Sequence, residues 1–592
     1  MKQKSYSVSF IANLNNKFPK KNDLLAGEWC LDRIITKKNF FKKKNVNISS
    51  RENNRNIYKE AKLCDKYYDR LLLDIISHFE KIHSFGWSKR SWEIFLGPWL
   101  NRYVSVIYDR YHTISYILQK YKVNEVKLIK DEKYNLVEQN LLNFRIISQD
   151  DKWNLKLFSK IYLKFFDTKE VKKKYLKIKF KKFTFGYEPV KKLNPLMLKI
   201  NQFFNSIIKK YKTLFNLVFY KTSINNKIAI LFLMVKRKKF LLPYQFGHKI
   251  PNLKYVSKKR TEKISSKFKL SKFEIVLRKL LFELIPFYYL ESIDNLIYLR
   301  KKLILPPDTN CNIFTSNSLW LDGIFKFWLA DVISKQTKLN CFQHGCNYGS
   351  TKYAYCEKTE VKLSDRFFSW GWSENNKKIK KFYATKTLFK NEFSLNRNNK
   401  ILVVLSNCHN YTSYHNTGTF SSKRSLIYFD LIKKICQFSK RKSNIFFRLP
   451  PNDKISFNLE KKLINIYGNL NFEKKENDFI NSCKKYELIL HTQDSTGFLE
   501  TMTLNKPSMI ILSSEIYKKN FREDAEKYYK KLEKVNIAFS SFEKYYKFIS
   551  NKSFNTYDWW NNKKTRRTRY LFCERFCKKT KYPLEAINKI IK

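Results

Sequence analysis

The sequence lacks long hydrophobic runs, cysteine pairs and a secretory leader. No stretch approaches the ~20 apolar residues of a membrane-spanning helix, and the strongest apolar run, Ile228–Val235, has the length of a strand. Met1–Asn16 contains no continuous apolar core of a signal peptide. The 11 cysteines are scattered and include no CxxC pair, which indicates reduced thiols. We therefore expect a cytoplasmic protein.

Several motifs of well-defined chemistry are also absent. There is no Walker A loop, GxGxxG, HExxH or GxSxG, and no signature of a nucleic-acid-binding module. Cys573 and Cys577 lie four residues apart without a nearby histidine or second cysteine pair, which argues against a zinc site. Glu357 and Glu360 form only a weak acidic cluster. We therefore expect a reaction without metal or cofactor and no specific nucleic-acid partner.

Positive charge is abundant, with 118 Lys and Arg against 51 Asp and Glu and a net charge of +67. Such a charge suits nucleic acid or the anionic inner face of a membrane. The lysines, however, are spread over nearly every segment and accompany many Asn, Ile, Phe and Tyr, while Gly and Pro are sparse. This joint bias is typical of an AT-rich coding sequence, so we attribute most of the charge to composition, with possible membrane-surface contact as a by-product.

The amino-terminal part indicates helices. Ile57–Phe85 has apolar residues at helical spacing and predicts a long amphipathic helix. In Ser91–Tyr111, Gly97 and Pro98 predict a break between two helices. Lys122–Lys221 is lysine-rich, aromatic and poor in helix breakers, and it indicates no particular element.

From Ile228 onward, strands and helices alternate in two series. The expected strands are Cys311–Ser316, Leu339–Phe342, Arg366–Trp370, Ile401–Leu405, Asn444–Arg448, Glu487–His491 and Ser508–Leu512. The expected helices include Leu319–Ser334, Ser425–Phe438 and Lys563–Lys578. Repeated βα units imply parallel sheets with helices on both faces. Two series separated near Glu374–Asn399 imply an α/β protein of two lobes.

The stretch Glu487–Leu512 has the pattern of a strand, a polar turn, a helix and a second strand. An apolar strand is followed by the N-cap formers Thr492, Asp494, Ser495 and Thr496, then by Gly497, which permits close backbone approach. A turn from strand to helix aims free N–H groups and the positive helix end at one point, where a phosphate can bind. The alternative is that this turn merely caps a helix.

Other polar residues also follow expected strands. His344, between Gln343 and Gly345, can assist a leaving phosphate or shuttle a proton, although a structural histidine has the same pattern. Arg448 ends a strand and suits a phosphate or an ordinary ion pair. Because the carboxyl ends of parallel strands share an edge, we expect these residues and Thr496 to line an interlobe cleft for a phosphate-bearing donor.

Two acidic positions in the amino-terminal part are further candidates. A strand ending at Gly27 would place Glu28 at the carboxyl edge of a sheet, although an ordinary loop carboxylate has the same appearance. Asp109 and Arg110, at the end of the aromatic segment, form either an internal ion pair or part of an acceptor pocket.

The chain resembles a family of bacterial transferases encoded among surface-carbohydrate genes, often near sialic-acid-like (nonulosonate) pathways. The resemblance is carried, in this order, by LLAGEWC (Leu24–Cys30), SWEIFLGPWL (Ser91–Leu100), YDR (Tyr108–Arg110), QHGCNYG (Gln343–Gly349), LSDRFFSWGW (Leu363–Trp372), RLPPND (Arg448–Asp453), HTQDSTGFLETMTLNKPS (His491–Ser508) and YDWW (Tyr557–Trp560). It implies a two-lobed glycosyltransferase fold of the GT-B type and distant similarity to transferases that use CMP- or CDP-activated donors.

We therefore expect two Rossmann-like parallel-sheet domains facing a cleft. Residues 1–385 would form the acceptor-side lobe, with a helical, basic insertion at about 55–220, and residues 386–592 the nucleotide-sugar-binding lobe with carboxyl-terminal helices. The donor-side candidates are Gln343, Gly345, Arg448, Thr492, Asp494, Ser495, Thr496, Gly497 and Glu500. His344 would assist the leaving group, and Glu28, then Glu360 and Asp109, are the candidates for the base.

The expected function is glycosyl transfer from a nucleotide-activated, CMP-linked sugar to a carbohydrate or lipid-linked acceptor of the bacterial surface. One alternative is a phosphotransferase that moves polyol-phosphate from a CDP donor on the same scaffold. The other is a non-enzymatic protein that binds nucleic acid or a membrane surface through its +67 charge.

Overall fold

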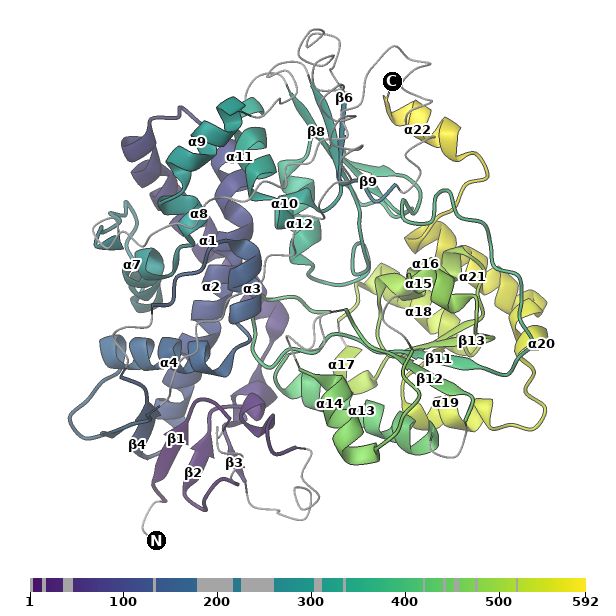
Figure 1. Ribbon diagram of the computed structural model, residues 1–592, viewed down its shortest axis with the longest axis horizontal. Helices are drawn as coiled ribbons and strands as arrows, with labels where there is room; N and C mark the ends of the chain where they lie inside the picture. The colour runs from purple at the N-terminus through teal and green to yellow at the C-terminus, as the bar shows by residue number, and fades with distance from the viewer. Residues whose placement is uncertain are drawn as a thin grey trace.

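The computed structural model describes most of the chain and shows an α/β protein (Figure 1). The described residues are 4–12, 18–35, 46–130, 135–177, 217–224, 260–302, 311–333, 337–418, 421–439, 443–451, 457–473, 478–517 and 520–591. Their strands form three parallel sheets. The strand expected at Ile228–Val235 lies outside the described residues.

The first sheet lies at the amino terminus, and of its strands the sequence indicated only the one before Gly27. Its strands are β1 (Tyr6–Ser9), β2 (Asp23–Leu25), β3 (Asn47–Ile48), β4 (Val123–Leu128) and β5 (Lys172–Tyr175), in the order β3-β2-β1-β4-β5. This is the Rossmann-type order, with its reversal between β1 and β4. The short 3-10 helices η1 (Glu28–Leu31) and η2 (Ser50–Asn54) follow β2 and β3.

Two long helices, α1 (Ile57–His83) and α2 (Lys89–Lys120), form the centre of the amino-terminal part. Helix α1 confirms the amphipathic helix expected over Ile57–Phe85. The break expected at Gly97 and Pro98 is wrong, because α2 passes through both residues, which are buried. A Cβ on Gly97 would stand 2.6 Å from the Tyr68 hydroxyl of α1, so the glycine permits the helices to pack closely. That packing outweighs the cost of an interior proline, about 3 kcal/mol.

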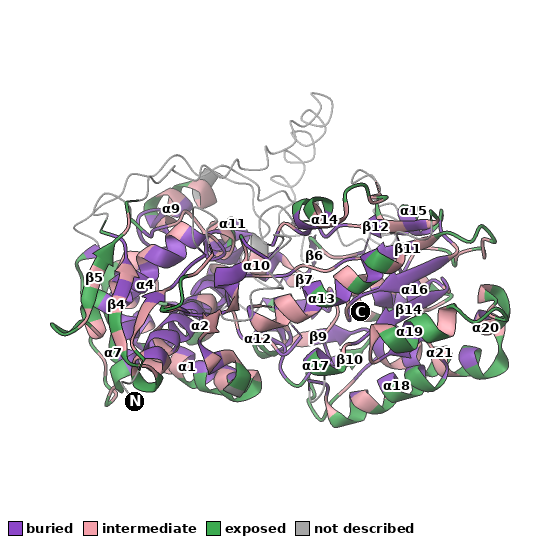
Figure 2. Cartoon of the chain, turned by 90° about the horizontal axis from the view of Figure 1, so that it is seen from below, coloured by how far each residue is buried: buried purple, intermediate pink, exposed green. Residues whose placement is uncertain are grey.

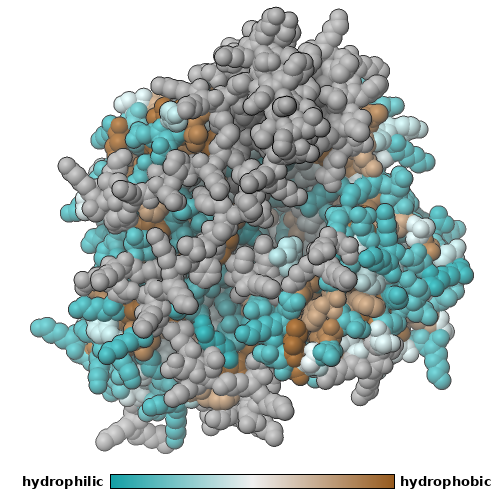
Figure 3. Space-filling model, in the orientation of Figure 1, coloured by the Kyte–Doolittle hydropathy of each residue, from teal (hydrophilic) through white to brown (hydrophobic). Residues whose placement is uncertain are grey.

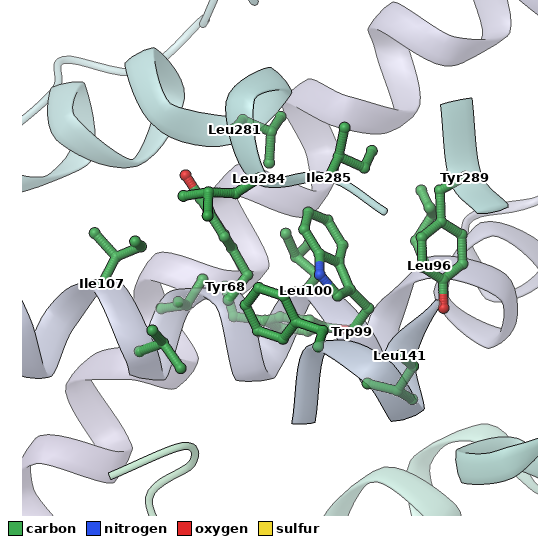
Figure 4. Close-up of a cluster of buried hydrophobic side chains, with 14 of the residues drawn as sticks. Tyr68, Leu96, Trp99, Leu100, Ile107, Leu141, Leu281, Leu284, Ile285 and Tyr289 are labelled. Atoms are coloured by element: carbon green, nitrogen blue, oxygen red, sulfur yellow. The ribbon is translucent and has the colours of Figure 1, made fainter. Parts of the chain in front are cut away.

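Large apolar side chains from several helices fill the space around α2 (Figure 4). The contributing helices are α1, α2, α3 (Leu141–Ile147), α4 (Asp151–Phe165), α7 (Lys272–Leu284), α8 (Phe287–Leu290) and α9 (Ile293–Lys302). Trp99 lies fully buried among Leu100, Ile285 and Tyr289. This apolar core continues under the first and second sheets, so the bundle joins them.

The second sheet contains β6 (Leu217–Tyr220), β7 (Asn312–Thr315), β8 (Lys338–Phe342), β9 (Arg366–Ser369) and β10 (Ile379–Lys381), in sequential order. Its helices include α10 (Ser318–Leu321), α11 (Gly323–Val332) and α12 (Tyr355–Leu363). The single helix expected over Leu319–Ser334 is divided in two, because the Asp322 side chain accepts from the Phe325 N–H and caps α11.

The third sheet contains β11 (Ile401–Val404), β12 (Ile445–Arg448), β13 (Leu488–His491), β14 (Ser508–Ile511) and β15 (Ala538–Phe539). Its order is β12-β11-β13-β14-β15, so the order in which successive parallel strands are added reverses between β11 and β13. In open α/β sheets, ligands bind outside the carboxyl ends of the strands at such a point. The loops after Val404 and His491 therefore border the expected ligand position.

The remaining helices surround the third sheet or follow it. They are α13 (Lys423–Ser439), α14 (Leu459–Tyr467), α15 (Phe479–Cys483), α16 (Thr496–Thr503), α17 (Ser514–Tyr517), α18 (Glu523–Lys534), α19 (Phe542–Ile549), α20 (Thr556–Asn561), α21 (Lys563–Phe576) and α22 (Pro583–Ile591). Helix α22 returns to the second sheet (Figure 1), where Ala586 and Ile587 pack with Phe342 and Phe368. The chain therefore crosses between the second and third sheets twice.

In the third sheet, buried strands lie inside and partly exposed helices outside, whereas the edge strand β5 of the first sheet is largely exposed (Figure 2). The described atoms on the face in Figure 3 are largely hydrophilic, with small separate hydrophobic areas. None of the described helices combines the length and apolar character that crossing a membrane requires. The expected α/β class, with parallel sheets and a helical part near the amino terminus, is confirmed.

Candidate functional site

The second and third sheets meet at their carboxyl edges, through the loop after β8 and the start of α16. The backbone N–H of Cys346 donates to Thr496 Oγ1 at 3.1 Å. A Cβ on the neighbouring Gly345 would stand 3.0 Å from the same oxygen, so this position favours glycine. His344 and Thr496, predicted from separate βα units, therefore lie in one local neighbourhood. We call this place the strand-edge junction, defined by residues 343–348, Lys386 and residues 494–500.

His344 is supported by a buried tyrosine and a buried glutamate. Its Nδ1 lies 3.1 Å from the Tyr348 hydroxyl and 3.4 Å from Glu360 Oε1. The Tyr348 hydroxyl donates to Glu360 Oε2 at 3.0 Å. A hydroxyl has one hydrogen, so toward Nδ1 it accepts, which assigns the imidazole hydrogen to Nδ1. His344 Nε2 is then left as the basic nitrogen.

The electrostatics keep this group neutral. Burial, aided by the positive charge of Lys386, lowers the pKa of His344 to about 4. Burial also raises the pKa of Glu360 well above its usual range, against the hydrogen bonds from Trp320 and Tyr348. At neutral pH the His344 imidazole is therefore uncharged. Because the His344 side chain is 23% exposed, a substrate can still reach it.

Gln343 holds the loop that carries His344. Its Nε2 donates to Gly345 O at 2.8 Å, and its Oε1 accepts from Trp370 N and Trp372 Nε1, both at 2.8 Å. The side chain is 1% exposed, so its amide is satisfied inside the protein. Its expected contact with a donor stays a prediction, and the geometry favours a positioning role.

The start of α16 presents donors toward the junction. The Ser495 hydroxyl accepts from the Phe498 N–H at 3.3 Å, so Ser495 is the N-cap of α16. This is the capping role that the sequence offered as the alternative. No hydrogen bond to the N–H groups of Thr496 or Gly497 is recorded among the described residues, as is usual in a first helical turn. A Cβ on Gly497 would meet the Phe479 ring at 3.0 Å, so glycine allows that ring to pack closely.

Lys386 is the junction residue that the sequence analysis missed. Its ammonium lies 3.5 Å from Glu500 Oε1, and its charge acts on both His344 and Cys346. Burial raises the pKa of Glu500, while Lys386 opposes that rise. The lysine lies in the connection between β10 and β11, where no strand or helix pattern marks it. The side chain is 36% exposed, so it can reach a ligand.

Three of the other donor-side candidates lie within the protein, and the side chains of two of them are engaged there. Thr492 donates to Val404 O at 2.8 Å and lies 2.6 Å from the Tyr428 hydroxyl. Arg448 pairs with Glu473 at 2.8 Å and donates to Ser482 Oγ at 2.7 Å. This is the ordinary ion pair that the sequence offered as the alternative to a phosphate. Their expected donor contacts stay predictions.

The third, Asp494, is buried, and its backbone N–H donates to the Tyr517 hydroxyl at 3.1 Å. Burial raises the pKa of Asp494 to about 7, against a hydrogen bond from Tyr529. Its carboxyl therefore favours a protonated state at slightly acidic pH. Its expected contact with a donor also stays a prediction.

Glu28 lies at the carboxyl edge of the first sheet, as its spacing predicted. Its Oε2 accepts from the Ser422 hydroxyl at 3.2 Å. Burial, with a contribution from Glu52, raises the pKa of Glu28 to about 7. Gln493, directly before the junction residue Asp494, donates its Nε2 hydrogen to Gly418 O at 3.0 Å. No contact between Glu28 and the junction is recorded among the described residues.

Asp109 belongs to a buried ion cluster at the centre of the amino-terminal part. It contacts Arg51 Nη1 at 3.2 Å, Arg55 Nη1 at 3.1 Å and Arg110 Nη1 at 2.9 Å. Burial opposes its ionisation, but the three guanidinium groups outweigh burial and lower the pKa of Asp109 to about 2. This is the internal ion pair that the sequence left open, and it makes Asp109 a poor proton acceptor.

Within the described residues, no group of three or more His, Cys, Asp and Glu side chains is arranged to hold a metal ion. The reaction without metal or cofactor stays a prediction. Polar groups at the junction include the basic nitrogen of His344, the ammonium of Lys386, the carboxyl groups of Asp494 and Glu500, and the donors of a helix end. Such a set suits a proton transfer beside a bound phosphate.

Two solved structures are similar to this chain. The MnaA–UDP co-structure from S. aureus has 16% identity and a TM-score of 0.33, covering 64% of this chain and 95% of that chain. The UDP-GlcNAc 2-epimerase from Neisseria meningitidis bound to UDP-GlcNAc has 12% identity and a TM-score of 0.32, covering 63% and 97%. At these TM-scores, neither structure is used to assign a property to this chain.

No curated protein is similar enough to this chain to count as a match. The family model described as LIC12162 family transferase matches residues 10–591, nearly the whole chain. This match confirms the transferase family that the motifs indicated. The protein belongs to the LIC12162 family of transferases.

Proposed function

We propose that the protein is a GT-B glycosyltransferase that moves a sugar from a nucleotide-activated, CMP-linked donor to an acceptor of the bacterial surface. The observation that carries this proposal is the contact of Cys346 N with Thr496 Oγ1 at 3.1 Å. This contact joins the loop of His344, whose Nδ1 lies beside Tyr348, to the start of α16. That helix end lies beside the point where the strand order of the third sheet reverses. Membership of a transferase family supports group transfer.

The donor phosphate would bind at the start of α16. The N–H groups of Thr496 and Gly497 belong to the first helical turn, whose dipole favours an anion. Thr496 Oγ1 accepts from Cys346, which leaves its own hydrogen for a phosphate oxygen. The Lys386 ammonium, 3.5 Å from Glu500 of the same helix, adds a positive charge that acts on His344.

His344 would act as the base. Its Nε2 takes the proton of the acceptor hydroxyl, and the acceptor oxygen forms a bond with the anomeric carbon of the sugar. The bond between that carbon and the donor phosphate oxygen breaks, and the nucleotide leaves with the electron pair. The charge that develops on the leaving phosphate is stabilised by Lys386 and the N–H groups of α16.

This assignment changes the role first expected for His344, which was assistance to the leaving group. With its hydrogen on Nδ1 toward Tyr348, the outer nitrogen accepts rather than donates. Glu360 would act as a positioning residue through Tyr348 and not as the base. Glu28 stays a candidate for binding the acceptor or, as an alternative, for taking its proton.

The acceptor would be a carbohydrate or a lipid-linked carbohydrate, and the reaction would take place in the cytoplasm. A GT-B site divides donor and acceptor between facing domains, and the acceptor would approach from the side of the first and second sheets. Contact with the inner membrane face would bring a lipid-linked acceptor within reach.

The test is turnover of the purified protein with CMP-, CDP- and UDP-activated sugars, read as nucleotide release and as transfer to a glycan. We expect a CMP-sugar to be consumed, with a product that lacks donor phosphate. A product that retains phosphate would overturn glycosyl transfer.

The residue assignments are tested with Thr496→Val and Lys386→Ala, which remove one hydroxyl and one charge at the junction. Lys434→Ala is the control, because Lys434 is half exposed and pairs with Glu543 on the outer face of α13. We expect weaker nucleotide binding in the first two variants only. Unchanged binding in both would remove the assigned site.

A further inference from the structure

A large cavity lies between the two chain crossings that connect the second and third sheets. It has a volume of about 1090 Å³ and is lined by the connection 388–392, by the end of α16, by α21 and by residues 579–583. A salt bridge of 3.3 Å between Lys579 and Glu392 ties the two crossings together. The cavity is distinct from the strand-edge junction, whose defining residues do not line it.

Cationic side chains dominate this cavity. They are Lys390, Arg566, Arg567, Arg569, Lys579 and Lys581. The acidic lining residues are Glu392 and Glu574, and both already pair, with Lys579 and with Lys578. The cavity therefore carries a clear excess of positive charge.

Part of this charge has no partner among the described residues. No salt bridge is recorded there for Arg566, Arg567 or Lys581, and all three are exposed. Arg569 stacks over the Trp560 ring at 4.1 Å and donates to Trp560 O at 3.0 Å. Burial, together with the positive charge of Arg566, lowers the pKa of Arg569 to about 10. A bound anion would relieve this crowding of like charges.

Exposed tyrosine side chains accompany the same charges. Tyr570 on α21 is 63% exposed, and Tyr582, beside the cavity residues Lys581 and Pro583, is 64% exposed. Leu571 and Leu584 are also exposed. Cationic groups next to tyrosine and leucine are typical of surfaces that lie in the headgroup region of a membrane. A site for a free nucleotide would not require such exposed apolar groups.

We infer that this cavity binds the phosphate groups of anionic phospholipids and docks the protein on a negatively charged membrane surface. Arg566, Arg567 and Lys581 contact the headgroup phosphates, while Tyr570 and Tyr582 enter the interface beside them. The inference does not depend on the donor site, and the two can fail separately.

The experiment is sedimentation of the full chain with vesicles of phosphatidylglycerol and phosphatidylcholine, compared with vesicles of phosphatidylcholine alone. The test variant carries Arg566→Gln, Arg567→Gln and Lys581→Gln. A control of equal charge change carries Lys527→Gln, Lys530→Gln and Lys531→Gln on the exposed face of α18. We expect binding to anionic vesicles to fall about a hundredfold in the test variant and to change little in the control.

Two further arms separate the possible anions. Tyr570→Ser with Tyr582→Ser should weaken vesicle binding and leave binding of soluble polyphosphate unchanged. Circular dichroism and nucleotide binding are measured on every variant, so that misfolding is recognised. Equal losses in the test and control variants would overturn the site. Vesicle binding that persists in the test variant, or tighter binding to polyphosphate or single-stranded DNA than to vesicles, would overturn the phospholipid assignment.

Discussion

Two clusters of charged and polar residues, the buried ion cluster around Asp109 and the strand-edge junction, differ in how their charges are satisfied. Asp109 contacts three guanidinium groups within 3.2 Å, and Arg55 also pairs with Glu52 and Glu60. At the junction, the imidazole is partly exposed and its basic nitrogen has no recorded hydrogen bond among the described residues.

The comparison teaches that candidate residues cannot be ranked by residue type alone. An aspartate surrounded by arginines is held ionised and cannot easily accept a proton, since its pKa lies near 2. His344 is uncharged at neutral pH and 23% exposed, and Tyr348 orients its other nitrogen, so its outer nitrogen is open to a substrate. We therefore interpret the first cluster as structural and the second as functional.

The largest effect should come from breaking the ion cluster. Asp109→Ala leaves three buried guanidinium groups without their common partner, and we expect it to lower the free energy of unfolding by about 3–5 kcal/mol. Asp430→Asn is the control, because Asp430 pairs with Lys433 on the surface and should cost no more than about 1 kcal/mol. Urea denaturation measures both. A stable but inactive Asp109→Ala protein would move Asp109 into the catalytic group.

The substitution His344→Ala tests whether the strand-edge junction is functional. We expect kcat to fall by about a hundredfold or more, because a general base contributes roughly 10²–10⁴-fold, while the unfolding midpoint changes little. His78→Ala is the matched control, since His78 pairs with Glu262 on the outer face of α1. Initial rates at saturating donor and acceptor are the measurement. Wild-type kcat in His344→Ala would show that the junction histidine is structural.

Lys386→Ala should act on donor affinity rather than on folding. A charge-assisted hydrogen bond to phosphate is worth roughly 1.5–3 kcal/mol, so we expect KM for the donor to rise about tenfold to a hundredfold. Lys386→Arg should restore part of the affinity because it keeps the charge. Equal KM values for Lys386→Ala and wild type would exclude contact with the donor phosphate.

Ser495→Ala tests the capping role, which the structure assigns to this residue. Loss of the N-cap should lower the free energy of unfolding by about 1 kcal/mol. Donor KM should change less than in Thr496→Val, because the Ser495 hydroxyl is already engaged by the Phe498 N–H. The reverse order of KM effects would return Ser495 to the donor site.

The pH dependence of kcat/KM distinguishes His344 from Glu28 as the base, and it is the smallest of the expected effects. A His344 pKa of about 4 leaves the base unprotonated above that value, so its activity is present at neutral pH and is lost only as pH falls through about 4. We expect kcat/KM to vary by no more than about twofold between about pH 5.5 and 7.5. If Glu28 were the base, kcat/KM would rise as pH increased through about 7, because burial raises its pKa there.

The sequence predicted seven of the ten described strands of the second and third sheets, because each of the seven is an apolar run followed by a polar turn. It missed β6, β10 and β15. In the first sheet it indicated only the strand before Gly27, for a physical reason. The described strand β3 has two residues and β5 reads Lys-Lys-Lys-Tyr, so neither shows the apolar pattern of a buried strand. Their pairing depends on β1 and β4, which are distant in sequence.

The site could be predicted only in part. His344 and Thr496 follow strands, and the shared edge of parallel strands brings such residues together. Lys386 follows no strand, and its position depends on Thr385, whose hydroxyl accepts from Trp370 Nε1 at 3.3 Å. The internal partners of Arg448 and Thr492 likewise come from segments distant in sequence, so their structural roles could not be recognised from spacing.

The most direct measurement is a crystal structure of the protein with CMP. The account predicts that the phosphate lies within hydrogen-bonding distance of the Thr496 and Gly497 N–H groups and of Lys386, with His344 Nε2 facing the position of the sugar. A nucleotide bound elsewhere, with the junction empty at saturating CMP, would contradict the account.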